Sequence, residues 1–420
     1  MFIIADDLTG ANDTAIQFVK HGFSALVITN AQFPDSALDS AYDIFSFNTD
    51  SRGMNGTAAF KTVRNLVRRL KTLKLEGACY KKIDSVLRGN PGPELAAVMD
   101  ELEIPLAIVA PSFPANRSTV ENGMLKSGAA GSQTEFDAVK IFTDTMDKKV
   151  ESIPLEKIRQ GEPGAAEYLR TRQACGAQVF VADALADDDL AIIYRLSAAL
   201  SQPHILAGSA GLGNQIAGNL KKDKKEREPP FSPHSSAEQR FLPALVIAGT
   251  RQGETAAQVS ALSENLAVPV VRFKTDLAMN GKSGEAVKLA YGEAAEQMKN
   301  KPEFCIVAVE SLFNAKFHEG DFDRGMTGSD AIVLAMGSLA RTLMDSFRFP
   351  VIITTGGDTS LEICKSLGVA GIKPLAEICP GIPIGKIAGG AFENHHIVTK
   401  SGRFGAKNAL IDIINYLAAK

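Results

Sequence analysis

The sequence predicts an α/β protein of two domains, each a mainly parallel sheet flanked by helices. Short apolar stretches of strand length alternate with amphipathic stretches of helical length along the chain, and this alternation is typical of parallel sheets. The chain has 420 residues, more than a single hydrophobic core usually supports. A charged, proline- and serine-rich segment at residues 221–240 interrupts the alternation near the middle. We therefore expect a first domain over residues 1–225, a linker over 226–241 and a second domain over 242–420.

The composition is that of an ordinary globular protein and argues against several classes. The net charge is −3 with 22% charged residues, so no basic surplus favours nucleic acid as a partner. No apolar run reaches the length of a membrane span, and no basic leader precedes the first strand, so we expect neither a membrane segment nor a signal peptide. The five cysteines form no CxxC pair, which fits a reducing, cytoplasmic location without disulfides or structural zinc.

The first half opens with a strand at residues 2–5, because four consecutive apolar residues suffice for one buried strand. A helix is expected from Asn12 onward, since apolar residues then recur at helical spacing and Asn12 or Asp13 can cap it. The amphipathic stretch 58–73 predicts a second helix, and Pro93 marks the entry to a third. Further strands are expected at residues 23–29, 43–47, from 78 onward, 105–110, 178–182 and 204–207. A polar stretch after the strand at 105–110 is interpreted as its closing loop.

The second half repeats the pattern of strands followed by polar turns and helices. Strands are expected at residues 244–248, 306–309 and 350–354, which are short apolar runs. A helix follows the first of these strands, and a terminal helix is expected from Ala406. The same order of strand, turn and helix in both halves indicates two sheets of one class.

Two aspartates, Asp6 and Asp7, follow the first strand directly and precede Thr9 and Gly10. In an open α/β sheet, ligands bind outside the carboxyl ends of the strands, which is where this turn lies. Adjacent carboxylates repel each other when both are ionised, so the pair favours a cation, a proton or a substrate hydroxyl in the gap. The alternative is that both aspartates only form the turn and cap the helix, because Asp is common in turns.

A second group of polar residues lies at or just past the other strand ends of the first half. It consists of Arg52, Lys81, Lys82, Asp84, Ser85, Arg88 and Asn90. This mixture suits a small polyhydroxylated acid, because Arg or Lys holds a carboxylate while carboxylates accept hydrogen bonds from hydroxyls. The alternative for the basic residues is a solvated surface.

The sequence carries no standard nucleotide signature. The GKS at residues 281–283 has Asp276 in place of the upstream glycine of a Walker loop. The GLG at residues 211–213 has Ile216 where a dinucleotide fingerprint has its third glycine. Both motifs are therefore rejected.

Three non-standard loops of the second half remain as candidates for binding phosphates. TGGDTS at 355–360 leaves a strand and enters a helix, so that backbone N–H groups approach an anion closely, and Asp358 can hold a Mg²⁺ that bridges phosphates. KSGRFG at 400–405 combines a cation, a hydroxyl and two glycines, and Thr250 and Gln252 form a third polar loop at a strand end. Together they indicate a nucleotide site. The alternative is that the glycines belong to ordinary turns between strand and helix.

Seven motifs make the chain similar to the four-carbon acid sugar kinases, a family that includes threonate, erythronate and 3-oxo-tetronate kinases. The motifs are IADDLTGANDTA, TDSR, KKIDSVLRGNPGPEL, APSFPANRSTVENG, GSAGL, TGGDTS and TKSGRFG. They cover almost the whole chain in order and represent both of its halves.

The resemblance implies ATP-dependent phosphorylation of the terminal C4 hydroxyl of a four-carbon sugar acid. It implies a sugar-acid-binding N-terminal domain, a nucleotide-binding C-terminal domain and an active site in the interdomain cleft. By motif, the implied substrate contacts are Asp6, Asp7, Arg52, Lys81, Lys82, Ile83, Asp84 and Ser85, with Asp7 as the catalytic residue. The implied cofactor contacts are Thr250, Gln252, Gly356, Gly357, Asp358, Thr359, Ser401 and Gly402, with Asp358 as the ligand of Mg²⁺.

The TDSR motif resembles the threonate-kinase branch of the family more than the 3-oxo-tetronate branch, and this resemblance implies D-threonate as substrate with 4-phospho-D-threonate as product. The same reaction on D-erythronate, L-threonate or a 3-oxo-tetronate is the alternative, because the contacts that distinguish one inverted hydroxyl are not visible in a sequence. A non-catalytic sugar-acid sensor is the alternative of another class, and it would not need TGGDTS and KSGRFG. The expected partners are the sugar acid and ATP, without nucleic acid or membrane, and the oligomeric state stays open, a homodimer included.

Overall fold

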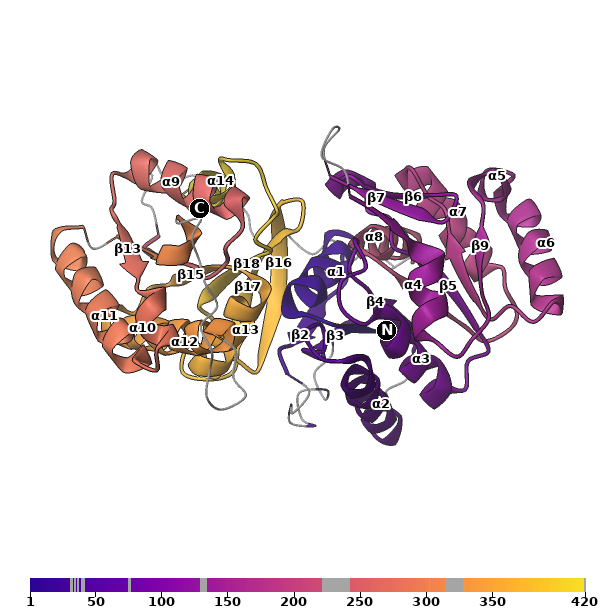
Figure 1. Cartoon of the computed structure of the whole chain (residues 1–420), viewed down its shortest axis with the longest axis horizontal. Coiled ribbons are helices and arrows are strands. Elements are labelled where there is room, and N and C mark those ends of the chain that lie inside the picture. Colours follow the sequence, from indigo (N-terminus) through magenta and orange to yellow (C-terminus); the bar gives the residue numbers. More distant parts are fainter. Residues whose placement is uncertain are drawn as a thin grey trace. The chain divides into compact units, whose positions relative to one another are not determined.

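The structure is a computed structural model that describes residues 1–30, 33, 35, 38, 42–74, 77–128, 134–220, 242–301, 303–313 and 328–418. It divides into two compact units, Met1–Lys225 and Glu226–Lys420 (Figure 1). The expected linker over residues 226–241 lies outside the described residues. In the described part of the chain, no helix is long and apolar enough to cross a membrane.

The N-terminal unit contains a parallel sheet, as the sequence predicted, and its strand order is β2-β3-β1-β4-β11-β5-β10-β9. Their bounds are Phe2–Ala5 (β1), Ala25–Ile28 (β2), Ile44–Asn48 (β3), Cys79–Lys82 (β4), Leu106–Ala110 (β5), Val150–Ile153 (β9), Val179–Ala182 (β10) and His204–Gly208 (β11). Most of these strands are buried along their whole length, which explains their continuous apolar runs in place of an alternating pattern.

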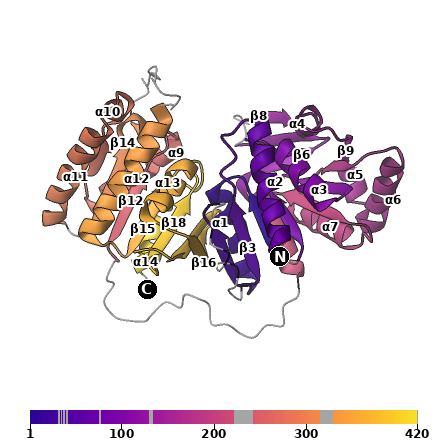
Figure 2. The ribbon, with the colours of Figure 1, turned by 90° about the horizontal axis from the view of Figure 1, so that it is seen from below.

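Helices cover both faces of this sheet. Their bounds are Leu8–Lys20 (α1), Gly56–Thr72 (α2), Pro91–Leu102 (α3), Ala138–Thr145 (α4), Leu155–Ile158 (α5), Gly161–Ala174 (α6), Asp187–Ala198 (α7) and Ala210–Asn219 (α8). Helices α1, α8, α7 and α6 contact one another in that order, whereas α2 contacts α3 and α3 contacts α4. Right-handed crossovers place these two groups on opposite faces. Figure 2 shows α2 and α3 side by side.

The first helix begins earlier than the sequence interpretation placed it. Asp7 is its N-cap, and the Asp7 carboxylate accepts a hydrogen bond from the backbone N–H of Gly10 at 2.8 Å. Asn12 and Asp13, which were expected to cap the helix, lie inside it and are 1% and 5% exposed. The expectation was wrong because Asp7 already satisfies a free N–H of the first turn, so only two residues separate β1 from α1.

The chain after β5 is more ordered than the loop that we expected. A 3₁₀ turn, Pro114–Asn116 (η2), leads into a small antiparallel sheet of Ser118–Glu121 (β6), Met124–Ser127 (β7) and Thr134–Asp137 (β8). Asn122 and Gly123 both have positive φ values, 53° and 74°, as a two-residue hairpin requires. Their N–H groups donate to the buried carboxylate of Asp183 at 2.7 and 2.9 Å, which holds the hairpin on the main sheet.

The C-terminal unit has the strand order β13-β14-β12-β15-β18-β17-β16. The bounds are Ala244–Ala248 (β12), Val270–Phe273 (β13), Phe304–Val309 (β14), Val351–Thr355 (β15), Gly371–Cys379 (β16), Ile382–Ala388 (β17) and His396–Lys400 (β18). The first five strands of the order are parallel, and β17 runs antiparallel to both of its neighbours. The unit is therefore mainly parallel, with an antiparallel hairpin at one side that the sequence interpretation did not include.

Two layers of helices cover the C-terminal sheet. Their bounds are Gly253–Leu266 (α9), Thr275–Met279 (α10), Ser283–Asn300 (α11), Gly328–Phe347 (α12), Gly357–Leu367 (α13) and Ala409–Ala418 (α14), and a 3₁₀ turn, Glu310–Leu312 (η3), follows β14. Helices α9 and α14 pack together on one side of the sheet, and α10 to α13 pack together on the other (Figure 1). The terminal helix starts at Ala409, three residues after the expected start.

In the sheet of each unit, there are two neighbouring strands whose following strands lie on opposite sides. Strand β1 continues to β2 on one side, and its neighbour β4 continues to β5 on the other. In the C-terminal sheet, β12 continues to β13 on one side, and its neighbour β15 continues to β16 on the other. The loops that leave such a pair diverge, and ligands of α/β sheets bind in the crevice between them. The residues singled out in the sequence lie at the carboxyl ends of these strands and of two neighbours, β3 and β18.

Candidate active site

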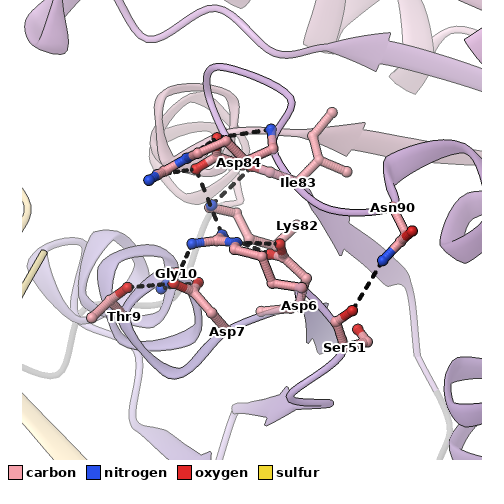
Figure 3. A network of polar contacts seen from close by, with 12 residues as sticks. Asp6, Asp7, Thr9, Gly10, Ser51, Lys82, Ile83, Asp84 and Asn90 are labelled. Carbon is pink, nitrogen blue, oxygen red and sulfur yellow. Dashed lines mark hydrogen bonds and ion pairs between the residues drawn. The ribbon is translucent and has the colours of Figure 1, made fainter. Parts of the chain in front are cut away.

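The acidic turn after β1 is buried and structured. Asp6 and Asp7 are 3% and 9% exposed, and Figure 3 shows them with Thr9 and Gly10 in one polar network. One oxygen of Asp7 accepts the N–H of Gly10, and the other accepts the hydroxyl of Thr9 at 2.6 Å. Asp7 therefore caps α1, as the alternative interpretation held, and also presents an oxygen toward the loop that follows β3.

Arg52 supplies the cation that the paired carboxylates require. Its Nε and Nη2 donate to the two oxygens of Asp6 at 2.7 and 3.0 Å, and its Nη1 donates to Asp7. Burial opposes ionisation of Asp6, but the charge and hydrogen bonds of Arg52 outweigh it and lower the pKa of that carboxyl below its ordinary value. Burial also opposes the charge of Arg52, and the two aspartates reverse this and raise its pKa. Asp6 and Arg52 therefore stay ionised together at neutral pH.

Asp84, which follows β4, extends this cluster. Arg88 binds both of its oxygens, with distances of 2.9 and 2.6 Å, and Arg52 Nη2 lies 3.6 Å away. Burial raises the pKa of Asp84, but the hydrogen bonds from Arg88 and the charge of Arg52 outweigh that effect and hold it well below its usual range. The side chain of Arg88 is 46% exposed, so it presents positive charge at the solvent side of the cluster.

Lys82 lies against the acidic turn. It is 5% exposed, and its Nζ donates to the carbonyl oxygen of Ile83 at 2.9 Å. A Cβ at Gly10 would lie 2.6 Å from Asp7 Oδ1 and 3.1 Å from Lys82 Nζ, so a glycine lets these two charged groups approach the start of α1. Figure 3 shows Lys82 between the aspartates of the turn and Asp84.

Lys81 points to the other face of the strand, as alternation along β4 requires. It is fully buried, and its Nζ contacts Glu94 Oε2 at 2.8 Å, the carbonyl of Lys82 at 2.7 Å and the carbonyl of Ile4 at 3.3 Å. These three acceptors use the three donors of an ammonium group. Lys81 therefore supports the site from within the protein and has no donor left for a substrate in this arrangement.

The sequence interpretation missed Glu94, the buried partner of Lys81. Glu94 is in the first turn of α3 and also accepts the hydroxyl of Ser51 at 2.7 Å. Ser51 and Arg52 both donate their backbone N–H to the carbonyl of Asp6, so this contact supports the loop that carries Arg52. Burial raises the pKa of Glu94 although Lys81 opposes the shift. Glu94 is the one carboxylate in the apolar first two turns of α3, whereas Asp100 and Glu101 lie at its end, and that placement was the signal that could have found it.

The remaining substrate candidates lie at the edges of this cluster. Ile83 is 1% exposed and contributes its carbonyl to Lys82. Ser85 is half-buried, and its carbonyl accepts the hydroxyl of Ser118 at 2.5 Å, which ties the loop after β4 to the small sheet. Asn90 donates to the carbonyl of Ser51 at 3.1 Å. The described contacts of these residues support the loops of the site.

Three loops of the C-terminal unit converge at the carboxyl ends of β12, β15 and β18. A Cβ at Gly249 would lie 2.1 Å from Thr359 Oγ1, and a Cβ at Gly402 would lie 2.6 Å from Thr250 Oγ1. The same added atom at Gly402 would lie 2.8 Å from Gln252 Cγ. The structure thus brings Thr250, Gln252, Thr359 and Gly402 together, and it needs glycines for this close packing.

The start of α13 has the features of an anion site. Gly356 is its N-cap with φ of 103°, a conformation that favours glycine, and it offers no side-chain cap for the first N–H groups. These N–H groups and the helix dipole favour a negative charge at this end. Gly357 is half-buried, Asp358 is exposed at the same turn, and Ser401 is half-buried in the neighbouring loop. In the part of the chain that the structure describes, no three His, Cys, Asp or Glu side chains are grouped as a metal site.

Comparison with known proteins agrees with this division of chemistry. Residues 1–216 match the family model described as a sugar-binding N-terminal domain, and residues 245–410 match the one described as a nucleotide-binding C-terminal domain. A sugar-binding domain followed by a nucleotide-binding domain defines a class of two-domain sugar kinases. Within this class, the chain belongs to the four-carbon acid sugar kinase family.

Named relatives match over nearly their full lengths. A D-threonate kinase of Salmonella typhimurium is 28% identical and covers 99% of this chain and 98% of its own. A D-erythronate kinase of Heliobacterium modesticaldum is 26% identical over 100% of this chain and 97% of its own. A solved structure from Haemophilus influenzae matches with a TM-score of 0.69 at 23% identity and covers 99% of both chains, which establishes the likeness of fold.

Proposed function

We propose that this protein is an ATP-dependent kinase that phosphorylates the C4 hydroxyl of a four-carbon sugar acid, with D-threonate as substrate and 4-phospho-D-threonate as product. The observation that carries the proposal is the presence of two complementary strand-end sites in a chain of this family. One gathers ionised carboxylates with cations, and the other gathers glycine loops at a helix N-terminus. The full-length match to a relative named D-threonate kinase supports the choice of substrate.

The N-terminal site has the groups that a sugar acid requires. In the proposal, Asp7 orients the C4 hydroxyl and accepts its proton, since it presents a carboxylate oxygen at a strand end. Lys82 and Arg52 hold the substrate carboxylate. Each retains N–H donors beyond the described contacts, because an ammonium has three and a guanidinium has five. Lys81 and Glu94 would not contact the substrate and would instead support the loop that carries Arg52.

The C-terminal site has the groups that a nucleotide requires. In the proposal, residues 356–359 at the start of α13 and the loop with Gly402 donate backbone N–H groups to the phosphates. The residues also fit Mg²⁺, because this ion is usually held by one or two carboxylates together with phosphate oxygens and water, and Asp358 offers a carboxylate beside the proposed phosphate site. When bound, Mg²⁺ would neutralise charge on the phosphates there.

Phosphoryl transfer needs positioning and charge neutralisation more than covalent chemistry by the protein. It also requires the attacking oxygen and the phosphate to be in line. We therefore propose that the two sites hold the sugar hydroxyl and the terminal phosphate together during turnover and exclude water, which would limit hydrolysis of ATP.

A coupled assay of ADP release tests the proposal. The full chain would be incubated with ATP and Mg²⁺ and with D-threonate, L-threonate, D-erythronate, L-erythronate or a 3-oxo-tetronate. We expect ADP release that depends on the sugar acid and is fastest with D-threonate. Preference for another acid would correct the substrate and retain the reaction. Binding of a sugar acid without ADP release from any of them would contradict the kinase and favour a sensor.

A further inference from the structure

The loop after β18 directs its carbonyl groups toward three buried side chains. Lys400 Nζ donates to the carbonyls of Ser401 and Phe404 at 2.8 and 2.9 Å. Thr255 Oγ1, on α9, donates to the carbonyl of Gly402 at 2.8 Å. Both Lys400 and Thr255 are fully buried. The ammonium and the hydroxyl therefore fix the loop from the protein side.

Gln258, one turn further along α9, completes this set. Its Nε2 lies 3.0 Å from each of the carbonyl oxygens of Phe404, Gly405 and Ala406. The amide is fully buried, and its Oε1 has no hydrogen-bond partner among the described residues. The side chain thus leaves an acceptor unsatisfied, which costs free energy, while its donor end holds three carbonyls of the loop.

This arrangement determines where the N–H groups of the loop point. In a trans peptide, the carbonyl of one residue and the N–H of the next are antiparallel. Because the carbonyls of Ser401 and Gly402 face Lys400 and Thr255, the N–H groups of Gly402 and Arg403 face away from them. A run of N–H groups turned to one side is a common way for backbone to bind phosphate.

The same loop is joined to the other proposed nucleotide contacts. Gly356 N, at the cap of α13, donates to the carbonyl of Lys400 at 2.9 Å. Gly402 packs against Thr250 and Gln252, since a Cβ added at Gly402 would collide with both side chains. Lys400 therefore lies between the phosphate-facing turn of α13 and the loop 401–406, with contacts to both.

We propose that Lys400, Thr255 and Gln258 are positioning residues, which hold the carbonyls of loop 401–406 inward so that the N–H groups of Gly402 and Arg403 face the phosphates of the nucleotide. The inference rests on the proposed function and adds residues that would not touch the substrate or the nucleotide. Burial lowers the pKa of Lys400 to about 8, and Glu254 on α9 opposes the shift. Above this pH the side chain loses its charge and one donor, so its hold on the loop weakens.

The test compares Lys400→Met, Gln258→Leu and Thr255→Val with the wild-type full chain. Lys299→Met is the matched control, because Lys299 is an exposed lysine on α11 that pairs with Glu296. Calorimetry with a non-hydrolysable ATP analogue and Mg²⁺ measures nucleotide binding, steady-state kinetics measures both KM values, and hydrogen exchange measures protection of residues 401–406. Thr255→Val removes a single hydroxyl with little change of shape, so it keeps the test open if a larger change prevents folding.

We expect Lys400→Met to weaken nucleotide binding about tenfold or more, the effect of losing hydrogen bonds from a charged group. Hydrogen exchange in residues 401–406 of Lys400→Met should accelerate, while its KM for the sugar acid should equal that of the wild type. The control variant should equal the wild type in all of these measurements. The KM for ATP of the wild type should rise above pH 8, and that of Lys400→Met should not follow this rise.

Two results would overturn the inference. One is that the variants fold and show unchanged affinity for the nucleotide and unchanged hydrogen exchange in residues 401–406. The other is equal weakening of sugar-acid and nucleotide binding, which would indicate a general loss of structure. Nucleotide binding that depends on Lys400 in a protein that transfers no phosphate would uphold the inference and contradict the proposed function. A wild type that binds no nucleotide would contradict both.

Discussion

Arg52 binds the carboxylate of Asp6 in a bidentate manner, with Nε and Nη2 at 2.7 and 3.0 Å from its two oxygens. The two residues come from the ends of neighbouring parallel strands, β3 and β1, so the sheet itself fixes their distance. The remaining nitrogen of the guanidinium reaches Asp7. One guanidinium thereby holds both buried carboxylates close together and lowers the pKa of Asp6.

Arg52→Lys should disable this arrangement without a change of charge, because lysine cannot bind two oxygens in a planar fork. We expect the KM for the sugar acid to rise about tenfold or more, equivalent to about 1.4 kcal/mol, while the KM for ATP stays unchanged. The acid limb of the pH–rate profile should move to higher pH, since the pKa of Asp6 would no longer be lowered as strongly. Arg64→Lys, at an exposed arginine that pairs with Glu101, is the control. Equal rises in both KM values would assign Arg52 to the fold instead.

Asp7→Asn separates catalysis from capping, because Asn caps helices as well as Asp does. We expect turnover to fall about 10²–10⁴-fold, the usual contribution of a positioned base, with little change in the melting temperature. Asp137→Asn is the matched control, since Asp137 caps α4 through the N–H of Lys140 at 2.8 Å. Steady-state kinetics and thermal unfolding measure both effects. Near-normal turnover of Asp7→Asn would leave Asp7 with its capping role alone.

The buried pair of Lys81 and Glu94 predicts a non-additive stability effect. Lys81→Met leaves a buried carboxylate without its cation, and Glu94→Gln leaves a buried ammonium without its anion. Each should lower the free energy of unfolding by about 3–5 kcal/mol, whereas the double variant should lose less than the sum. Urea unfolding of the full chain measures the cycle. Additive losses would show that the two groups do not interact energetically in the folded protein.

Asp84 predicts a loss of stability in acid. Its pKa in the folded protein lies well below the ordinary value of 3.8, because Arg88 and Arg52 outweigh the opposing effect of burial. A group of this kind stabilises the folded state fully above its unfolded pKa and loses that contribution as the pH falls below about 4. Between about pH 5 and pH 2, the melting temperature of the wild type should therefore fall by more than that of Asp84→Asn. The difference should develop below about pH 4. Parallel pH curves from thermal unfolding would show that Asp84 does not carry this effect.

The residues at strand ends could be predicted because parallel strands end at a common edge of the sheet. Asp6 and Arg52 are far apart in sequence, yet the order of the strands brings them together. The first residue of α1 could not be determined from the sequence, because Asp7 and Asn12 are both good capping residues. Only the geometry of the turn decides which of them caps the helix. Glu94 was missed because it does not follow a strand but lies in the first turn of α3, where only the fold shows that it meets Lys81.

The contacts around Lys400 were missed for a related reason. The sequence shows a cation beside two glycines, which predicts a contact with phosphate. The structure instead shows that the cation is buried and holds carbonyls of its own loop. Whether a lysine binds a ligand or the backbone depends on which carbonyl groups lack partners in the folded chain. A short sequence motif does not contain this information.

The most direct test of the proposed kinase is the identity of its product. The full chain would be incubated with ATP, Mg²⁺ and D-threonate, and the product examined by mass spectrometry and by phosphorus NMR with proton coupling. C4 carries two protons and C2 and C3 carry one each, so a phosphate on C4 predicts a triplet, together with the mass of a phosphorylated four-carbon acid. A doublet would place the phosphate on another carbon, and inorganic phosphate without any sugar phosphate would contradict the kinase.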